Sequence, residues 1–233
     1  MIVYGKNVAK ELINNNKKIK KAYLLTTLKG SDIDNMLSNI TNVTYLEKKE
    51  LDKLADSHNQ GIVLEIDDYN YLTEKDMLNN LSDNPFVVIL DHLEDPHNFG
   101  AIIRTCESAG VDYIIIPKNR SVSVNSTVMK TSTGAVDNVK IVLVTNLNQT
   151  INKLKEKGLW IVGTDMENSI LYDEIDYTIP TCLIIGSEGF GMSELVRKNC
   201  DFVARIPMYG KINSLNASVA AGIMIYEVVR QRK

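Results

Sequence analysis

Six short apolar runs, all beyond Pro85, constrain the fold of this chain most strongly. They are Phe86–Leu90, Tyr113–Ile116, Lys140–Val144, Leu159–Thr164, Cys182–Ile185 and Phe202–Ile206. Because the apolar residues run on instead of alternating with polar ones, they indicate strands covered on both faces, as in a parallel sheet. Helical patterns lie between several of these runs, at Phe99–Ala109, Leu147–Lys157 and Met192–Asn199, and Leu215–Arg232 closes the chain. This alternation predicts an open, doubly wound α/β sheet.

The first part of the chain has a different pattern. Helical patterns at Asn7–Asn15, Asp32–Ile40 and Lys48–His58 alternate with strand patterns at Lys21–Thr26, Val43–Leu46 and Gly61–Ile66. Residues 67–84 are rich in Asp, Asn, Tyr and Lys and predict a linker with one short helix near Glu74–Leu81. We therefore expect a small α/β domain over 1–66, a linker over 67–84 and a larger domain over 85–233.

Charge is spread unevenly along the chain. The formal net charge of −3 argues against indiscriminate binding of nucleic acid. Residues 1–30, however, contain seven lysines and a single acid, Glu11. Such a basic face can hold phosphates, although a solvated, lysine-rich helix end explains it equally well. The RNA-binding candidates are Lys6, Lys17, Lys18, Lys20 and Lys21.

The sequence also bears on the compartment. The N-terminus lacks the apolar run of a signal peptide, and no stretch approaches the roughly 18 apolar residues that span a bilayer. Cys106, Cys182 and Cys200 lie far apart with no CxxC pair. We expect a cytoplasmic protein with free thiols, no membrane contact and no structural metal.

Loops rich in Gly, Ser and Asn follow three of the predicted strands, where ligands bind on such sheets. In the first loop, Asn98 can cap the next helix and Gly100 permits close approach of the backbone. Arg104 opposes the helix dipole, so we expect a phosphate or carboxylate partner, unless Arg104 simply pairs with Glu107.

The second loop, Gly186–Gly191, superficially resembles a dinucleotide fingerprint, or it is a tight turn that binds nothing. Glu188 would face a pyrophosphate with a carboxylate, and the loop lies late in the sheet, so an adenosine ligand without phosphates suits it better. In the third loop, Ile206–Ala220, either Ser214 or Asn216 can cap the last helix.

Together the three loops resemble the three motifs of the SpoU (TrmH) family of RNA ribose 2′-O-methyltransferases. The matching residues are Asn98, Gly100 and Arg104, then Gly186, Glu188 and Gly191, then Pro207, Met208, Gly210, Ser214, Leu215, Asn216 and Ser218. Lys130–Ala135 is similar to a further family segment. Residues 1–66 resemble the small, ribosomal-protein-like RNA-binding domain of the branch that methylates a guanosine of large-subunit (23S) ribosomal RNA.

The resemblance implies S-adenosylmethionine as cofactor, a deep C-terminal trefoil knot of the SPOUT type, and a homodimer. The cofactor would contact Gly163, Thr164, Gly186, Ile206, Met208 and Leu215. Ile102, Ile103 and the apolar face of the last helix are candidate dimer contacts, or else core residues.

The resemblance also implies a catalytic set of Arg104, Asn98, Glu188, Ser214 and Asn216. Arg104 is the base proposed for the family, but a guanidinium with a reference pKa above about 12 resists that role. We expect Arg104 to orient an RNA phosphate and stabilise developing negative charge, with Glu188 as the competing general base.

Other functions stay open at this point. Transfer RNA is an alternative substrate within the family, and a non-catalytic RNA-binding protein is an alternative of another class. A nicotinamide-dependent oxidoreductase would need a glycine fingerprint after the first strand of the sheet, which Asp95–Gly100 does not supply.

Overall fold

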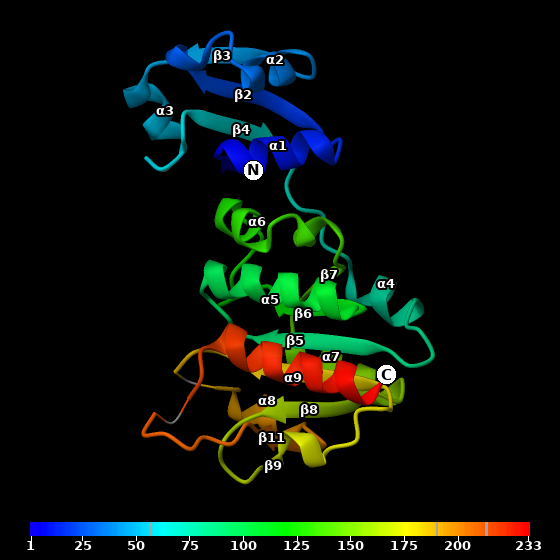
Figure 1. The fold of residues 1–233 in the computed structure, drawn as a ribbon. Helices are drawn as coiled ribbons and strands as arrows, with labels where there is room; N and C mark the ends of the chain where they lie inside the picture. The colour runs from blue at the N-terminus through cyan, green and yellow to red at the C-terminus, as the bar shows by residue number, and fades with distance from the viewer. Residues whose placement is uncertain (56, 190, 213) are drawn as a thin grey trace. The chain divides into compact units, whose positions relative to one another are not determined.

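The computed structural model describes residues 1–55, 57–189, 191–212 and 214–233. The chain divides into two compact units (Figure 1). The smaller combines Met1–Asn70 with Val124–Gly134, and the larger combines Tyr71–Ser123 with Ala135–Lys233. Residues 71–84, within the segment predicted as a linker, belong to the larger unit. There Leu72 pairs with Val142, and Met77 of helix α4 (Glu74–Asn79) is fully buried.

The larger unit is built on a seven-stranded sheet in the order β7-β6-β5-β10-β8-β11-β9. Every neighbouring pair in it is parallel. The strands are β5 (Phe86–Asp91), β6 (Tyr113–Pro117), β7 (Ile141–Val144), β8 (Trp160–Thr164), β9 (Ile170–Leu171), β10 (Thr181–Gly186) and β11 (Phe202–Arg205). All residues of β5 and β6 are buried, as their continuous apolar runs predict. The parallel α/β sheet is thus confirmed.

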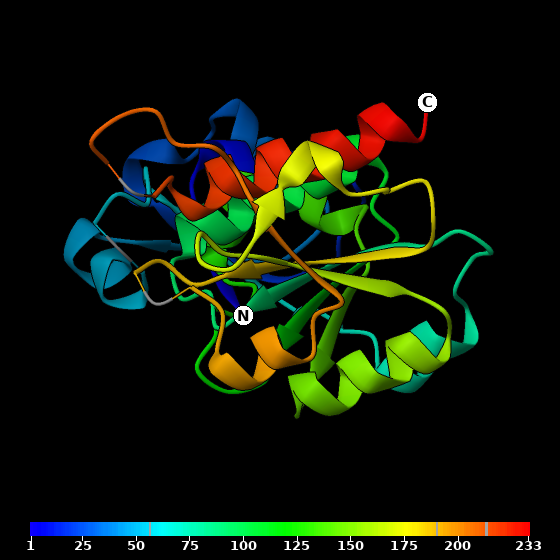
Figure 2. The same ribbon diagram turned by 90° about the horizontal axis from the view of Figure 1, so that it is seen from below.

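Helices cover both faces of this sheet (Figure 2). Helices α5 (Pro96–Ala109) and α9 (Ala217–Gln231) pack side by side on one face. Helices α7 (Leu147–Glu156) and α8 (Glu194–Lys198) lie on the other, where α7 also contacts α4. This arrangement brings the carboxyl ends of β5, β8, β10 and β11 to one edge of the sheet, together with the starts of α5 and α9.

The N-termini of the two long helices correct one predicted cap and confirm another. Asp95 caps α5 by accepting hydrogen bonds from the backbone N–H groups of His97 and Asn98. The expectation that Asn98 is this cap was wrong, because Pro96 fits the first helical position and starts the helix earlier. Asn216, one of the two predicted candidates with Ser214, caps α9.

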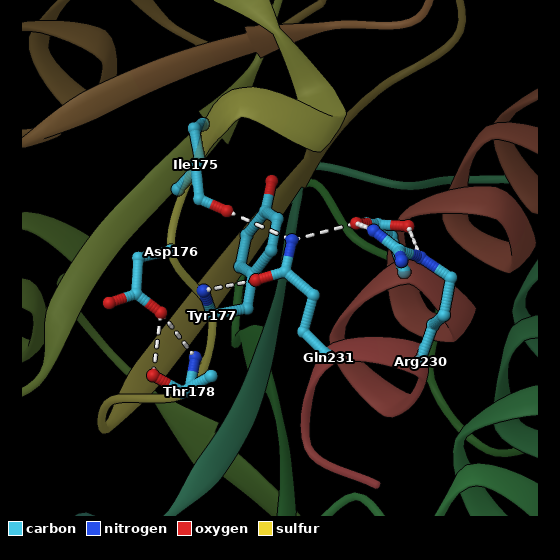
Figure 3. A network of polar contacts seen from close by, with 7 residues as sticks. Ile175, Asp176, Tyr177, Thr178, Arg230 and Gln231 are labelled. Carbon is cyan, nitrogen blue, oxygen red and sulfur yellow. Dashed lines mark hydrogen bonds and ion pairs between the residues drawn. The ribbon is translucent and has the colours of Figure 1, made fainter.

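The C-terminal end of α9 is fastened to the chain segment before β10 (Figure 3). Gln231 accepts a hydrogen bond from the N–H of Tyr177 and donates one to the carbonyl of Ile175, both at 3.0 Å. Arg232 donates to four backbone carbonyl oxygens, those of Asn84, Pro85, Tyr177 and Ile179. Two adjacent side chains therefore tie the helix end to the start of two central strands.

The smaller unit has a four-stranded mixed sheet in the order β1-β4-β2-β3. Its strands are β1 (Ile2–Tyr4), β2 (Ile19–Leu25), β3 (Val43–Leu46) and β4 (Ile62–Ile66), and its helices are α1 (Lys6–Asn14), α2 (Asp32–Ser38), α3 (Lys48–Leu54) and α6 (Ser126–Ser132). Sequence reasoning missed β1 and α6 and made α2 and α3 too long. Helix α3 ends because Ala55 is extended, and the predicted extension also covers Asp56, which lies outside the described residues.

Candidate active site

A cavity of about 550 Å³ opens beyond the carboxyl ends of β8, β10 and β11. It is lined by residues 164–166, 185–189, 191, 204–206, 208, 214–217 and 220. The second and third glycine- and asparagine-rich loops therefore meet at one site, at the sheet edge where a doubly wound fold binds its ligands.

Five of the six predicted cofactor-binding residues line this cavity: Thr164, Gly186, Ile206, Met208 and Leu215. Gly163 does not. A Cβ atom built on Gly163 would lie 2.5 Å from Cε of Met192 and 2.7 Å from Sγ of Cys200. The missing side chain at Gly163 thus serves packing behind the cavity wall.

The loop after β10 closes on itself. Ser187 and Gly191 exchange two backbone hydrogen bonds, each 3.0 Å long. A Cβ atom on Gly186 would stand 2.3 Å from the carbonyl carbon of Gly191 and 2.5 Å from the nitrogen of Met192. Because both neighbours are backbone atoms, only glycine fits at this position without moving the loop.

Three predicted catalytic side chains, from three separate segments, form one hydrogen-bonded cluster. Asn98 and Asn216 both donate from Nδ2 to Oε1 of Glu188, the second at 2.9 Å. The same Nδ2 of Asn216 lies 3.0 Å from Oδ1 of Asn98. Oδ1 of Asn216 meanwhile accepts the N–H groups of Ser218 and Val219, so one amide serves both the helix cap and the cluster. The carboxylate of Glu188 therefore lies near the N-terminus of α9, where the helix dipole favours negative charge.

Of the other two predicted catalytic residues, Ser214 lines the cavity and Arg104 does not. Arg104 is exposed on α5, lines neither cavity of this site, and makes no side-chain hydrogen bond or ion pair with any residue that the structure describes. The alternative pairing with Glu107 is absent from the described contacts, in which Glu107 accepts a hydrogen bond from Asn138. A single chain thus assembles the predicted set without Arg104.

A second cavity, of about 570 Å³, adjoins the first and shares Ser187, Glu188 and Gly191 with it. Its wall includes Asp91, which is buried and accepts hydrogen bonds from the N–H of Ser193 and from Nδ1 of His92. Sequence reasoning missed Asp91 and His92. Their position directly at the end of the first strand of the sheet was the signal that could have identified them.

The predicted RNA-binding lysines belong to the smaller unit, and Lys6, Lys17, Lys18, Lys20 and Lys21 are all exposed. The Nζ atom of Lys20 lies 2.7 Å from a carboxylate oxygen of Asp67. The hydrogen bond to Asp67 raises the pKa of Lys20. Lys20 therefore stays charged, and its ion pair with Asp67 already offsets part of that charge.

The cysteines line neither cavity. Cys106 and Cys182 are buried, and burial raises the pKa of both thiols. Among the described residues, no group of three or more His, Cys, Asp or Glu side chains could hold a metal ion. Within the same residues, no helix is both long and apolar enough to cross a membrane.

Comparisons with known proteins agree on one family. The model of the SpoU rRNA methylase family matches residues 85–226, and that of RNA 2′-O ribose methyltransferase substrate binding matches residues 2–72. A relative from Staphylococcus saprophyticus, which its name places in the TrmH family of tRNA/rRNA methyltransferases, is 45% identical, over 100% of this chain and 96% of its own.

Solved structures share the fold. The SpoU methyltransferase AviRb from Streptomyces viridochromogenes, crystallised with AdoMet, superposes with a TM-score of 0.85 at 24% identity, over 100% of this chain and 90% of its own. An AdoMet-bound rRNA methyltransferase from Sinorhizobium meliloti superposes with a TM-score of 0.77 at 25% identity. The match covers 98% of this chain and 86% of that one. The family models, the relative and the site geometry lead to one conclusion: the chain belongs to the SpoU (TrmH) family of RNA methyltransferases.

Proposed function

We propose that this protein transfers a methyl group from S-adenosylmethionine to a ribose 2′-hydroxyl of RNA, and that the acceptor is a guanosine of 23S ribosomal RNA. The observation that carries the proposal is the Asn98–Glu188–Asn216 cluster on the wall of a cavity that the predicted cofactor-binding residues line. The AdoMet-bound neighbours and the substrate-binding family model support it.

The cavity fits this cofactor. Its volume of about 550 Å³ lies within the usual range for small-ligand sites. Ile185, Ile206 and Leu215 offer apolar surface for an adenosyl group, and the carboxylate of Glu188 offers a counter-charge for a cationic one. When bound, S-adenosylmethionine supplies an electrophilic sulfonium methyl group.

The side chains of the cluster have separable roles. Asn98 and Asn216 hold Oε1 of Glu188, whereas its Oε2 makes no hydrogen bond with any described residue. Oε2 is therefore the oxygen that can accept the proton of a 2′-hydroxyl. The positioning of an acceptor oxygen against a bound methyl donor supplies much of the acceleration. Arg104 orients an RNA phosphate and stabilises the developing oxyanion.

Arg104 reaches a site in this proposal through a homodimer. Val219 and Tyr226 of α9 are each 50% exposed, so α9 presents an apolar stripe beside α5, which carries Arg104. In the proposed dimer a second copy packs on this stripe, and Arg104 acts at the partner's cavity. Ile102 and Ile103 cannot be the dimer contacts, because both are fully buried within their own chain.

The dimer is tested by analytical ultracentrifugation of Tyr226→Glu, with Tyr209→Glu as the control on another exposed tyrosine. We expect Tyr226→Glu alone to be monomeric and inactive while it still binds S-adenosylmethionine. A wild-type protein that sediments as a monomer would remove this part of the proposal.

The trefoil knot, the cytoplasmic location and the absence of a metal stay predictions.

The reaction is tested with labelled S-adenosylmethionine and RNA from a strain that lacks the gene, followed by mapping of the 2′-O-methylated nucleotides. Incorporation into 23S RNA at a guanosine is the expected result. Incorporation into transfer RNA alone would favour the other substrate of the family, and no incorporation into RNA would refute the activity. Arg104→Ala that turns over at the normal rate would remove Arg104 from the mechanism.

A further inference from the structure

The second cavity is the feature of the larger unit that the proposed function does not yet use. Its volume of about 570 Å³ can hold a nucleotide. Ser187, Glu188 and Gly191 belong to its wall and to the wall of the cofactor cavity. A ligand in the second cavity would therefore lie across one loop, and across Glu188, from a methyl donor in the first.

The carboxylates of this second cavity are mostly satisfied by the protein itself. Asp91 is held by His92 and by the N–H of Ser193 at 2.8 Å. Asp95 accepts the first N–H groups of α5, and Glu188 accepts two amide donors. Glu94 is exposed and has no described partner. Three of the four carboxylates in the wall are thus already fixed by donors of the protein itself.

Two side chains in the wall have polar groups that make no bond to any described residue. The guanidinium of Arg120 makes no hydrogen bond or ion pair with any described residue. His92 donates to Asp91 through Nδ1, so a neutral imidazole offers Nε2, which has no partner among those same residues, as an acceptor. Both residues have left-handed backbones, with φ of 57° at His92 and 53° at Arg120. This conformation is uncommon outside glycine, and such strain concentrates at functional sites.

We propose that this cavity binds the acceptor nucleotide of the RNA, with Arg120 on a backbone phosphate, His92 accepting from a hydroxyl or N–H group of the nucleotide, and the ribose facing Glu188. The planar fork of an arginine matches the oxygens of a phosphate diester. The inference rests on the proposed methyl transfer, because that reaction requires the ribose beside the cofactor.

The test compares three full-length variants. Arg120→Asn removes the charge and keeps a residue type that tolerates a left-handed backbone. Arg120→Lys keeps the charge without the fork. Lys118→Asn is the matched control, because Lys118 is an exposed cation two residues away that does not line the cavity. Binding to unmethylated 23S RNA made by transcription in vitro is measured at several salt concentrations without cofactor, and S-adenosylmethionine binding is measured separately.

For Arg120→Asn we expect about tenfold weaker RNA binding and a salt dependence less steep by about one unit, as for one lost phosphate contact. Affinity for S-adenosylmethionine should stay unchanged, Arg120→Lys should recover part of the loss, and Lys118→Asn should bind like the wild type. The inference is overturned if Arg120→Asn binds RNA like the wild type, if Lys118→Asn loses as much, or if the wild type binds no RNA.

Methyl transfer by the wild type to the same RNA separates the two proposals. RNA binding that depends on Arg120, in a protein that transfers no methyl group, would refute the activity and leave the nucleotide site standing. Methyl transfer with a KM for RNA that Arg120→Asn does not change would refute the nucleotide site alone.

Discussion

Gly186→Ala is the substitution with the most direct structural consequence for the cofactor cavity. The new Cβ atom would lie 2.3 Å, 2.5 Å and 2.7 Å from three backbone atoms of Gly191 and Met192. Real Cβ contacts are not that short, so the loop must move and the two Ser187–Gly191 hydrogen bonds must break or lengthen. Each such bond contributes about 1 kcal/mol, and overpacking adds about 1–3 kcal/mol. A cost of about 3 kcal/mol to restore the binding conformation corresponds to about 100-fold weaker binding.

The assay is calorimetric titration of S-adenosylmethionine into the wild type, Gly186→Ala and Gly189→Ala. Gly189 lies in the same loop, and a Cβ atom there would meet nothing within 4 Å, although its φ of 82° disfavours alanine. We expect the control to lose about 1 kcal/mol, or about fivefold in affinity. The reasoning fails if Gly186→Ala binds within about threefold of the wild type, or if the two variants lose equally.

Three further predictions concern α9. Asn216→Asp keeps the oxygen that caps α9 but removes the N–H donors to Asn98 and Glu188, so the melting temperature should hold while methyl transfer falls. Equal losses of stability and methyl transfer would refute the separation of the cap from the cluster. Arg232→Ala should lower the free energy of unfolding by about 2–4 kcal/mol in urea titrations, since four carbonyl oxygens lose a charged donor, and a loss under about 1 kcal/mol would contradict this. Hydrogen bonds from Arg230 hold the pKa of Glu227 in the folded protein below its ordinary value of 4.5. The ionised Glu227 therefore stabilises the folded state above pH 4.5, and this contribution is lost as the pH falls through the lowered pKa. Arg230→Gln should flatten this loss in urea titrations between about pH 5 and 3, and an unchanged profile would exclude Glu227 as its source.

Most elements of the larger unit could be predicted from the sequence because they carry strong local signals. The buried strands read as uninterrupted apolar runs, and the predicted β5 and β6 differ from the structure by a single residue at one end. Helix α6 was missed because its seven residues, Ser126–Ser132, are mostly small or polar and have no clear apolar period. Its Asn125 cap was a local signal, but helices this short depend on packing for their stability.

In the predicted site too, some features could be identified from local sequence and others depended on the tertiary structure. The residue types at Asn98, Glu188 and Asn216 were identifiable from the loops that carry them. That one amide of Asn216 both caps α9 and fixes Glu188 required knowing which groups surround it. Gly163 shows the opposite case, because a glycine predicted to bind the cofactor lies outside the cavity lining and makes room for Met192 and Cys200.

By itself, the sequence determined the parallel sheet, the order of its helices and the loops that carry the family's motifs, since apolar runs, caps and glycines act locally along the chain. Only the tertiary structure decided which side chains meet. It joined Glu188 to two asparagines, left Arg104 exposed, and placed Arg120 and His92 in a second cavity that shares a wall with the first. The physical reason is that the hydrogen-bonded residues of the cluster lie 28 to 118 residues apart along the chain. Crossover connections between parallel strands bring such distant segments to one edge of the sheet.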